Sequence, residues 1–257
     1  MNDYVTNIRT ADGSIVKLES HNALLSTARI AKEYAKAGYP DRYVVFAEAR
    51  HKPDKDGKFK GDVENGVFMS CVLRPSIFPS QASLMSSLAS VALATALDGH
   101  TSKSIGIGWG GNIYCDGREI GKVTIEGKLD NFTSYEYMIV TFEAVLDKES
   151  FPPRINDLIK KVFESENTTV PIIIAKDILN KFFPFYSNIK SSSKFMNIYK
   201  EKFVLCGKKI KYLEDGKKKT FRITDLDIQN GALKIEGAGK RAVTVFSPSK
   251  VILPKKI

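Results

Sequence analysis

The sequence predicts an α+β fold that ends in a small β-barrel, and three observations support this prediction. Segments with strand-like alternation and segments with helical spacing follow one another over about the first 200 residues. Residues 105–126 alternate apolar positions on both sides of Asp116-Gly117, which is typical of a hairpin. From Phe203 onward, short apolar runs are separated by glycine turns, and this pattern predicts a barrel of about 50 residues.

The bulk composition is that of a packed protein with one large domain, or with a large domain and a small one. Hydrophobic residues make up 43% and aromatic residues 10% of the 257 residues, which is enough for a sizeable core. No apolar run is long enough for a membrane span, and Met1 is followed by polar residues rather than by a signal segment. A membrane is therefore not an expected partner.

The three cysteines, Cys71, Cys115 and Cys206, are widely spaced and form neither a CxxC pair nor a zinc pattern. We therefore expect a reduced, cytoplasmic chain without a metal site. Cys71 and Cys115 stand in apolar strand contexts, where buried and unreactive thiols are expected.

The net charge of the chain is +10, and a charge of this size favours an acidic partner. The cations are spread widely, and their densest run, Lys217-Lys218-Lys219, is expected at a hairpin tip. No helix-turn-helix or zinc pattern is present, so nucleic acid is not an expected partner.

The first expected elements are a strand at residues 15–18, a helix at residues 28–36 and a buried strand at residues 43–48. Ser26 is the expected N-cap of the helix, because a serine side chain can accept a hydrogen bond from a free backbone N–H. Gly38 is expected to end the same helix.

Residues 50–64 are polar and charged and include one proline and two glycines, so they predict a loop. A strand at residues 66–74, stopped by Pro75, and a long helix at residues 80–97 follow. The hairpin comes next, and after it a strand is expected at residues 135–146.

The pattern then changes to helical spacing. Residues 152–166, 171–183 and 192–202 predict a small helical segment. The turn-rich strands that come after it place a domain boundary near residue 200. The predicted domains are therefore residues 1–200 and residues 201–257.

A set of short motifs occurs in an order and spacing that together are fairly specific. They are Ser26-Thr27, Ala31, Gly38, Pro40, Ala47-Glu48, Leu73-Arg74-Pro75, the Trp109 hairpin and Gly231-Ala232-Leu233. With these motifs the chain resembles the biotin–protein ligases over roughly residues 15–253. The resemblance implies a class II synthetase-like catalytic domain, with a mixed β-sheet and helices packed on one face, and then an SH3-like β-barrel. About 25 residues precede the first motif, too few for the winged DNA-binding domain of some such ligases.

Active members of that family make biotinyl-adenylate from biotin and ATP and pass the biotin to a lysine of a carrier protein. The resemblance implies biotin and ATP with magnesium as ligands, and a biotin carboxyl carrier domain as partner. Because the attacking carboxylate and the α-phosphate are both anionic, lysine and arginine must neutralise them. Matching the family's motifs puts ligand contacts at Ser26, Thr27, Arg50, Gly66, Trp109, Gly111, Asn112 and Lys122, and catalytic positions at Lys58 and Glu119.

The family's reactive charges are replaced at several of these positions. Glu119 stands at the place of the catalytic lysine, which reverses two units of charge, and Lys122 replaces a glycine that admits biotin. Asn112 replaces a carboxylate suited to magnesium. Each lost charge contact costs about 2–4 kcal/mol of transition-state stabilisation. Further replacements lie at Ala28, Gly108, Lys52–Lys60 (where the family has an arginine-rich loop) and Thr141–Val145.

Three functions follow as hypotheses. The first is a degenerate ligase-like protein with weak or no biotinylation and a binding or regulatory role, which requires no cofactor. The second is an active biotin ligase, or a lipoyl or octanoyl transferase, in which Lys58, Lys60, Arg50 or Lys122 is rearranged to hold phosphate. The third is a homodimeric scaffold that pairs through a sheet edge.

Structural roles compete with functional ones at three of the predicted site residues. Trp109 lies between isoleucines, and such a tryptophan usually packs in the core. Glu119 can form an exposed ion-pair cluster with Arg118 and Lys122, and Lys122 can be a solvated surface residue.

Overall fold

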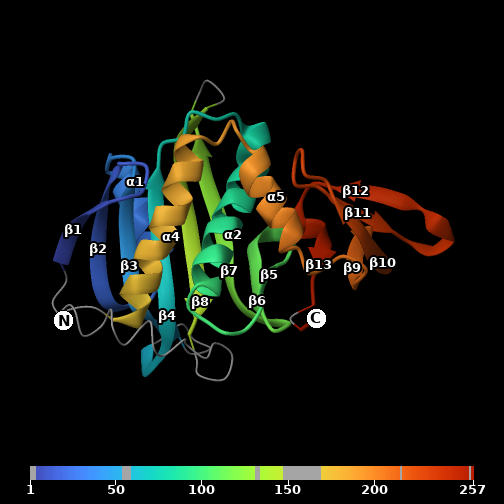
Figure 1. Cartoon of the computed structure of the whole chain (residues 1–257), viewed down its shortest axis with the longest axis horizontal. Helices are drawn as coiled ribbons and strands as arrows, with labels where there is room; N and C mark the ends of the chain where they lie inside the picture. Colours follow the sequence, from blue (N-terminus) through green and yellow to red (C-terminus); the bar gives the residue numbers. More distant parts are fainter. Residues whose placement is uncertain (1–3, 54–58, 131–133, 147–168, 215, 255) are drawn as a thin grey trace.

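The computed structural model describes residues 4–53, 59–130, 134–146, 169–214, 216–254 and 256–257. Eight strands form one sheet in the order β1-β2-β3-β4-β8-β7-β6-β5, as Figure 1 shows. Strands β2 and β3 run parallel, and the other neighbouring pairs are antiparallel. The strands are Tyr4–Arg9 (β1), Ile15–Leu24 (β2), Tyr43–Pro53 (β3), Phe59–Leu73 (β4), Ile105–Ile107 (β5), Asn112–Cys115 (β6), Arg118–Leu129 (β7) and Tyr135–Val145 (β8).

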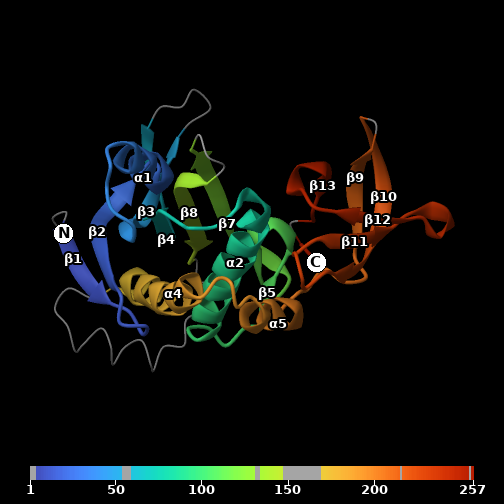
Figure 2. The same ribbon diagram turned by 90° about the horizontal axis from the view of Figure 1, so that it is seen from above.

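Helix α1 (Thr27–Lys36) connects the parallel strands β2 and β3, which need a crossover between them. Helices α2 (Ala82–Asp98), α4 (Val170–Ser187) and α5 (Ser193–Glu201) contribute to the main core. Helix α1 packs on the opposite face of the sheet with its own smaller core, as Figure 2 shows from above. The expectation that the helices pack on one face is therefore wrong for α1. Its buried side chains, Ala31 and Ala35, face strands β3, β4 and β8.

The expected loop at residues 50–64 is wrong for most of that segment. Strand β3 continues to Pro53 and β4 begins at Phe59, and Arg50 is paired with Glu64 in the register of the two strands. Backbone pairing does not depend on apolar side chains, and opposite charges placed across from each other favour the ladder. Composition alone therefore gave a misleading prediction here.

The hairpin at Asp116-Gly117 is confirmed. Asp116 has φ 46° and Gly117 has φ 79°, and two consecutive positive φ angles are those of a type I′ turn. The helix at residues 28–36 with Ser26 as N-cap is also confirmed, since the Ser26 side chain accepts a hydrogen bond from the Arg29 backbone N–H. Strand β1 was not expected, and residues 152–166 lie outside the described residues.

The C-terminal segment forms a five-stranded antiparallel sheet in the order β12-β11-β10-β9-β13. Its closure into an SH3-like barrel stays a prediction. The inner face of this sheet continues the main core through residues such as Ile223 and Leu233. The strands are Lys209–Glu214 (β9), Lys217–Leu226 (β10), Leu233–Glu236 (β11), Ala242–Val245 (β12) and Val251–Ile252 (β13). Among the described residues, no helix is both long and apolar enough to cross a membrane.

Candidate functional site

A pocket of about 610 Å³ opens at the start of helix α1, and we call it the α1 pocket. It lies where the ends of β2 and β3 meet the neighbouring strands β4 and β8. Its walls combine apolar and charged side chains. The described lining residues are Leu24, Leu25, Ser26, Thr27, Arg50, Lys52, Glu64, Phe68 and Glu143.

The turn into α1 positions the two hydroxyl residues of the pocket. Ser26 has an extended backbone, φ −163° and ψ 113°, and its side chain caps the helix. The Thr27 hydroxyl is buried and lies 2.8 Å from the Ser70 hydroxyl, which in turn lies 2.9 Å from that of Thr141. This row of hydroxyl groups links α1 to β4 and β8, so Thr27 is fixed from the interior side.

Arg50 is the central cation of the α1 pocket, and its guanidinium is already bonded to two carboxylates. Its guanidinium donates to Glu64 at 2.6 Å and to Glu143 at 3.0 Å, and it lies 4.8 Å from the centre of the Phe68 ring. Burial opposes the charge of Arg50, but the bond to Glu64 and the charge of Glu143 outweigh it and raise the pKa of Arg50. Lys52 lies 3.5 Å from Glu64. Two cations therefore face two carboxylates, and the lining has no formal net charge.

Lys122 lies next to this cluster on the neighbouring strand. It is the cross-strand partner of Glu143 on one side and of Asn112 on the other. Side chains of directly paired residues leave a sheet on the same face, so Lys122 and Glu143 share the face of the pocket. Lys122 is exposed and is not among the described lining residues. It lies beside Glu143 and is not part of the described pocket lining.

Glu119 lies away from the α1 pocket. It is paired with Tyr114, after a register shift in the β6–β7 ladder. Burial, and to a lesser extent the charge of Glu119, raises the pKa of Tyr114 to about 12. The Tyr114 hydroxyl donates to the Pro254 carbonyl at 2.6 Å, so this part of the hairpin holds the C-terminal strand region.

Trp109 serves the packing between the two sheets. Its side chain is 4% exposed, and its indole N–H donates to the Gly231 carbonyl at 2.8 Å. With Gly231 and the start of α2 it borders a small cavity of about 230 Å³. The core role expected for Trp109 is confirmed, and the structure does not bring Trp109 to the α1 pocket.

Gly66 and Gly111 have structural reasons to be glycine. A Cβ on Gly66 would lie 2.1 Å from the Ala144 carbonyl oxygen on β8. Gly111 has φ +97°, and a Cβ there would lie 2.3 Å from the Val123 carbonyl oxygen. Their expected ligand contacts stay predictions, as does that of Asn112 at the start of β6. The predicted catalytic residue Lys58 lies outside the described residues.

The motif match did not point to Glu64, Glu143, Phe68 or Lys52 as pocket residues. Glu64 was hidden because residues 50–64 were expected to form a loop rather than paired strands. The signal that could have found it is the opposite charge of Arg50 and Glu64 at matching hairpin positions. Phe68 and Glu143 enter the pocket through the β4–β8 register, in which they are partners.

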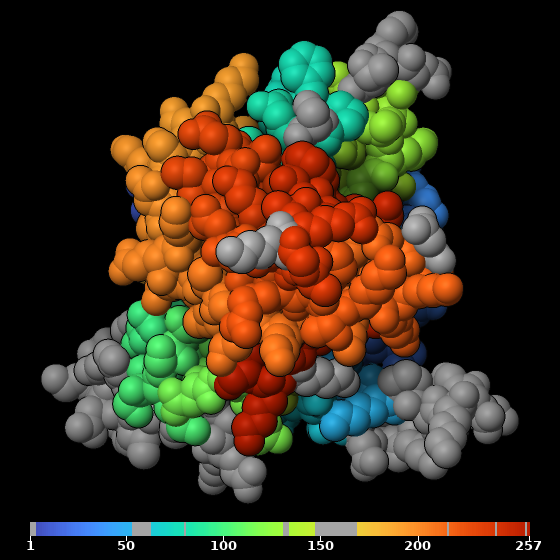
Figure 3. All heavy atoms as spheres, turned by 90° about the vertical axis from the view of Figure 1, so that its right-hand side faces the viewer, coloured from blue at the N-terminus to red at the C-terminus, as the bar shows by residue number. Residues whose placement is uncertain are grey.

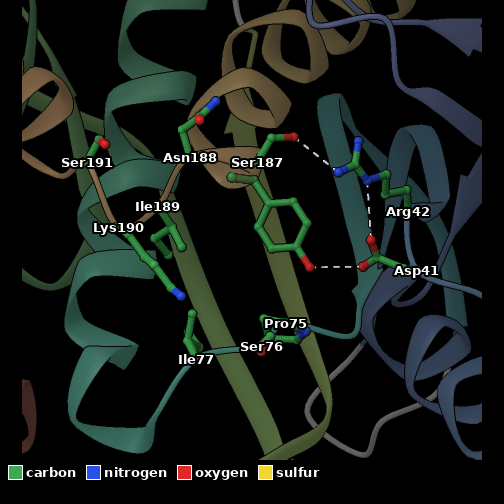
Figure 4. Close-up of a pocket in the computed structure, with 11 residues that line it drawn as sticks. Asp41, Arg42, Pro75, Ser76, Ile77, Ser187, Asn188, Ile189, Lys190 and Ser191 are labelled. Carbon is green, nitrogen blue, oxygen red and sulfur yellow. Dashed lines mark hydrogen bonds and ion pairs between the residues drawn. The ribbon is translucent and has the colours of Figure 1, made fainter.

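A second cavity, of about 450 Å³, lies beside the C-terminal end of α4 and is shown in Figure 4. Asp41 accepts hydrogen bonds from the Tyr186 hydroxyl at 3.0 Å and from Arg42 Nε at 3.2 Å, and Arg42 also donates to Ser187 at 3.1 Å. None of the residues expected at the site lines this cavity. Its polar groups bind one another and tie α4 to the turn before β3.

The described lining of the α1 pocket fits a small organic molecule, and both of its cations are paired with carboxylates rather than free for a triphosphate. Leu24, Leu25 and Phe68 supply apolar walls, and the volume lies within the range of about 300–1,000 Å³ of small-molecule sites. A triphosphate needs uncompensated cations or a metal, and Arg50 is already paired with two glutamates. Among the described residues, no group of three or more His, Cys, Asp and Glu side chains is arranged to hold a metal ion.

Comparison with known proteins gives a consistent fold but no close relative in sequence. No protein-family model matches the chain, and no curated protein matches it. The biotin protein ligase of Aquifex aeolicus is similar in structure, with 17% identity and a TM-score of 0.63, over 92% of this chain and 97% of that one.

Two further structures agree with it. The Aquifex aeolicus ligase in complex with biotin and ATP gives a TM-score of 0.62 at 16% identity, over 91% of this chain and 97% of that one. A biotin protein ligase-like protein of unknown function from a Silicibacter species gives 0.58 at 15% identity, over 90% and 94%. The chain therefore has a biotin protein ligase-like fold.

Proposed function

We propose that this chain is a ligand-binding protein of the biotin-ligase type that has weak or no ATP-dependent biotinylation activity. The observation that carries the proposal is that Arg50, the central cation of the α1 pocket, forms ion pairs with both Glu64 and Glu143. Its charge is therefore neutralised by the protein's own carboxylates. Glu119, at the position of the catalytic lysine, supports the proposal. A transition state that gathers negative charge finds too few free cations among the described lining residues of the pocket.

The ligand that fits this proposal is a small molecule of about the size of biotin with an apolar part. Its apolar part would pack on Phe68 and on the leucines at the end of β2. Biotin is the first candidate, because the Aquifex ligase of the same fold was solved with biotin and ATP. The proposed ligand contacts on this side are Ser26, Thr27 and Arg50.

Calorimetric titration with biotin, with ATP and magnesium, and with both tests the proposal. We expect binding of biotin that ATP does not strengthen, and no release of pyrophosphate when both are present. A parallel assay supplies a biotin carboxyl carrier domain as acceptor, which is the proposed protein partner. Substantial transfer of biotin to that domain would refute the proposal.

The alternative is an active biotin ligase or a related acyl transferase with a rearranged site. The observation in its favour is that Lys122 and Lys52 lie next to the pocket and keep positive charge there. In this case ATP strengthens biotin binding, and pyrophosphate is released with biotin, lipoate or octanoate. Lys122→Gln would then reduce the rate, whereas Lys128→Gln, further along the same strand, would not.

Two structural proposals accompany this function. Residues 201–257 are proposed to be an SH3-like domain, since all five of their strands pair antiparallel in a single sheet. A homodimer is proposed to form through the edge of the large sheet at β1, where Val5 is 56% exposed. Light scattering on the pure protein distinguishes a dimer from a monomer.

A further inference from the structure

The positive charge of this protein is concentrated in its C-terminal segment. Residues 201–257 contain 14 Lys and Arg against 6 Asp and Glu, so +8 of the formal charge of +10 lies there. The expectation that the charge is spread widely is therefore wrong. This segment forms the five-stranded sheet, which covers the side of the molecule that faces the viewer in Figure 3.

The register of the β9–β10 hairpin places apolar side chains on its inner face and several cations on its outer face. The pair Ile210 and Phe221 is buried and forms the inner face. The neighbouring pairs, Lys209 with Arg222 and Lys211 with Thr220, are exposed and leave the outer face, because side chains alternate along a strand. Lys218 continues the same outer row toward the tip.

The outer cations are not neutralised by neighbouring carboxylates. Among the described residues, Lys209, Lys211, Lys218 and Arg222 take part in no ion pair, whereas Lys219 and Arg241 on the other side both bind Glu214. Lys211 donates to the Thr220 hydroxyl at 2.6 Å, and Arg222 donates to the Gly207 carbonyl at 2.7 Å. These bonds orient the cations without cancelling their charge.

The tip of the hairpin projects as a two-stranded ribbon. Strand β11 pairs with β10 only from Arg222 onward, and β13 pairs with β9 only at Lys211 and Tyr212. Residues 213–221, as far as the structure describes them, therefore pair only within the β9–β10 hairpin, and they include the three consecutive lysines. Figure 2 shows this hairpin extending away from the rest of the molecule.

We infer that this outer face and ribbon bind the phosphate backbone of duplex DNA without reading its sequence, in contrast to the expectation drawn from the absence of a DNA-binding motif. Protein–protein interfaces are depleted in lysine and enriched in aromatic residues, whereas DNA-binding surfaces are strongly positive. No described outer-face residue of β9 or β10 is aromatic, and binding of single strands relies on aromatic stacking. The major groove of B-DNA admits a two-stranded ribbon, whereas that of duplex RNA is too narrow.

The test is fluorescence anisotropy of a labelled random-sequence DNA duplex with the full chain at several salt concentrations. We expect the logarithm of the binding constant to fall linearly with the logarithm of salt, with a slope of about −0.9 per phosphate neutralised. The variant Lys209→Gln/Lys211→Gln/Lys218→Gln/Arg222→Gln is expected to bind at least about tenfold more weakly, with a slope shallower by about 3.6.

The matched control removes four exposed lysines from the rest of the molecule, as Lys17→Gln/Lys36→Gln/Lys176→Gln/Lys190→Gln. It loses the same net charge and is expected to keep most of the affinity. Circular dichroism shows whether each variant is folded. If the four-residue patch variant does not fold, Lys217→Gln/Lys218→Gln/Lys219→Gln at the exposed tip is tested for the same loss of affinity. Equal losses in patch and control variants, absence of binding at low salt, or tighter binding of duplex RNA or polyglutamate would each overturn the inference.

Discussion

Arg50 on strand β3 reaches across the intervening strand β4 and donates to Glu143 on β8 at 3.0 Å. On the way its guanidinium lies over the ring of Phe68 on β4. The same group binds Glu64 at 2.6 Å. The central cation of the α1 pocket is thus ion-paired with the protein's own carboxylates, and this pairing limits how strongly the pocket binds an anionic ligand.

Removal of one of these carboxylates should improve binding of anionic ligands. In Glu143→Gln the negative charge beside Arg50 is lost, and we expect affinity for a carboxylate ligand such as biotin to rise about three- to tenfold, or about 1 kcal/mol. Calorimetry measures the change. Glu126→Gln is the control, because Glu126 on β7 pairs with Lys32 rather than with Arg50. Equal affinity in both variants would show that Glu143 does not restrain Arg50.

The indole of Trp109 should hold the two sheets together. Trp109→Phe keeps most of the apolar surface but leaves the partly buried Gly231 carbonyl without its donor, which costs about 1–2 kcal/mol. Thermal unfolding should show a melting temperature lower by about 2–4 °C per kcal/mol. Phe246→Leu is the control, since Phe246 is 69% exposed and its replacement should change little.

Arg74 should stabilise helix α1, and through it the pocket. Its guanidinium donates to the carbonyls of Ala35 and Tyr39 at the end of the helix and to that of Glu136. Cations at a helix C-terminus satisfy free carbonyls and favour the helix dipole. We expect Arg74→Met to lower the free energy of unfolding by about 2–3 kcal/mol. Arg29→Met, on the exposed side of the same helix, should leave the denaturation midpoint nearly unchanged.

Glu19 should stabilise the folded protein at neutral pH, and this contribution should be lost in acid. Burial opposes its charge, but hydrogen bonds from Tyr43, His21 and Tyr34 outweigh burial and lower the pKa of Glu19 below its ordinary value of 4.5. Since the unfolded chain then binds the proton more readily, this stability is present above about pH 4.5 and is lost as pH falls below it.

The measurement for Glu19 is the free energy of unfolding from pH 7 down to pH 3. Glu19→Gln should cost about 1–3 kcal/mol at pH 7 and flatten the decline in acid. The exposed Glu236 serves as the control, because Glu236→Gln should leave the pH dependence as it is. A decline of unchanged steepness in Glu19→Gln would assign the acid sensitivity to other groups.

The thiols should differ in reactivity. Cys71 and Cys115 are buried, and burial raises the pKa of each, whereas Cys206 is exposed. Because the thiolate is the reactive form, we expect a chromogenic disulfide to titrate one thiol in the folded protein and three after denaturation. The single reactive thiol should disappear in Cys206→Ser. Rapid labelling of two or more thiols in the native state would contradict the buried positions.

Local sequence was sufficient for many elements of this fold. The N-cap at Ser26 and the turn at Asp116-Gly117 depend on neighbouring residues only, so pattern and residue type predicted them. The long helix and the apolar parts of most strands of the large sheet were also predicted, because their apolar residues repeat with a regular period, whereas β1 and the polar ends of β3 and β4 were not. The family motifs likewise pointed to the correct fold.

Only the tertiary structure decided which charged side chains pair in the α1 pocket. Arg50 and Glu143 are far apart in the sequence, and they meet because β3, β4 and β8 lie side by side in a register that no local pattern encodes. The placement of α1 on the opposite face is a similar outcome, as is the bond from Trp109 to Gly231. The sequence by itself determined the elements and their order, since these depend on nearby residues. Which charges face each other was decided by long-range strand pairing, because a carboxylate neutralises a cation only when folding brings the two within a few ångströms.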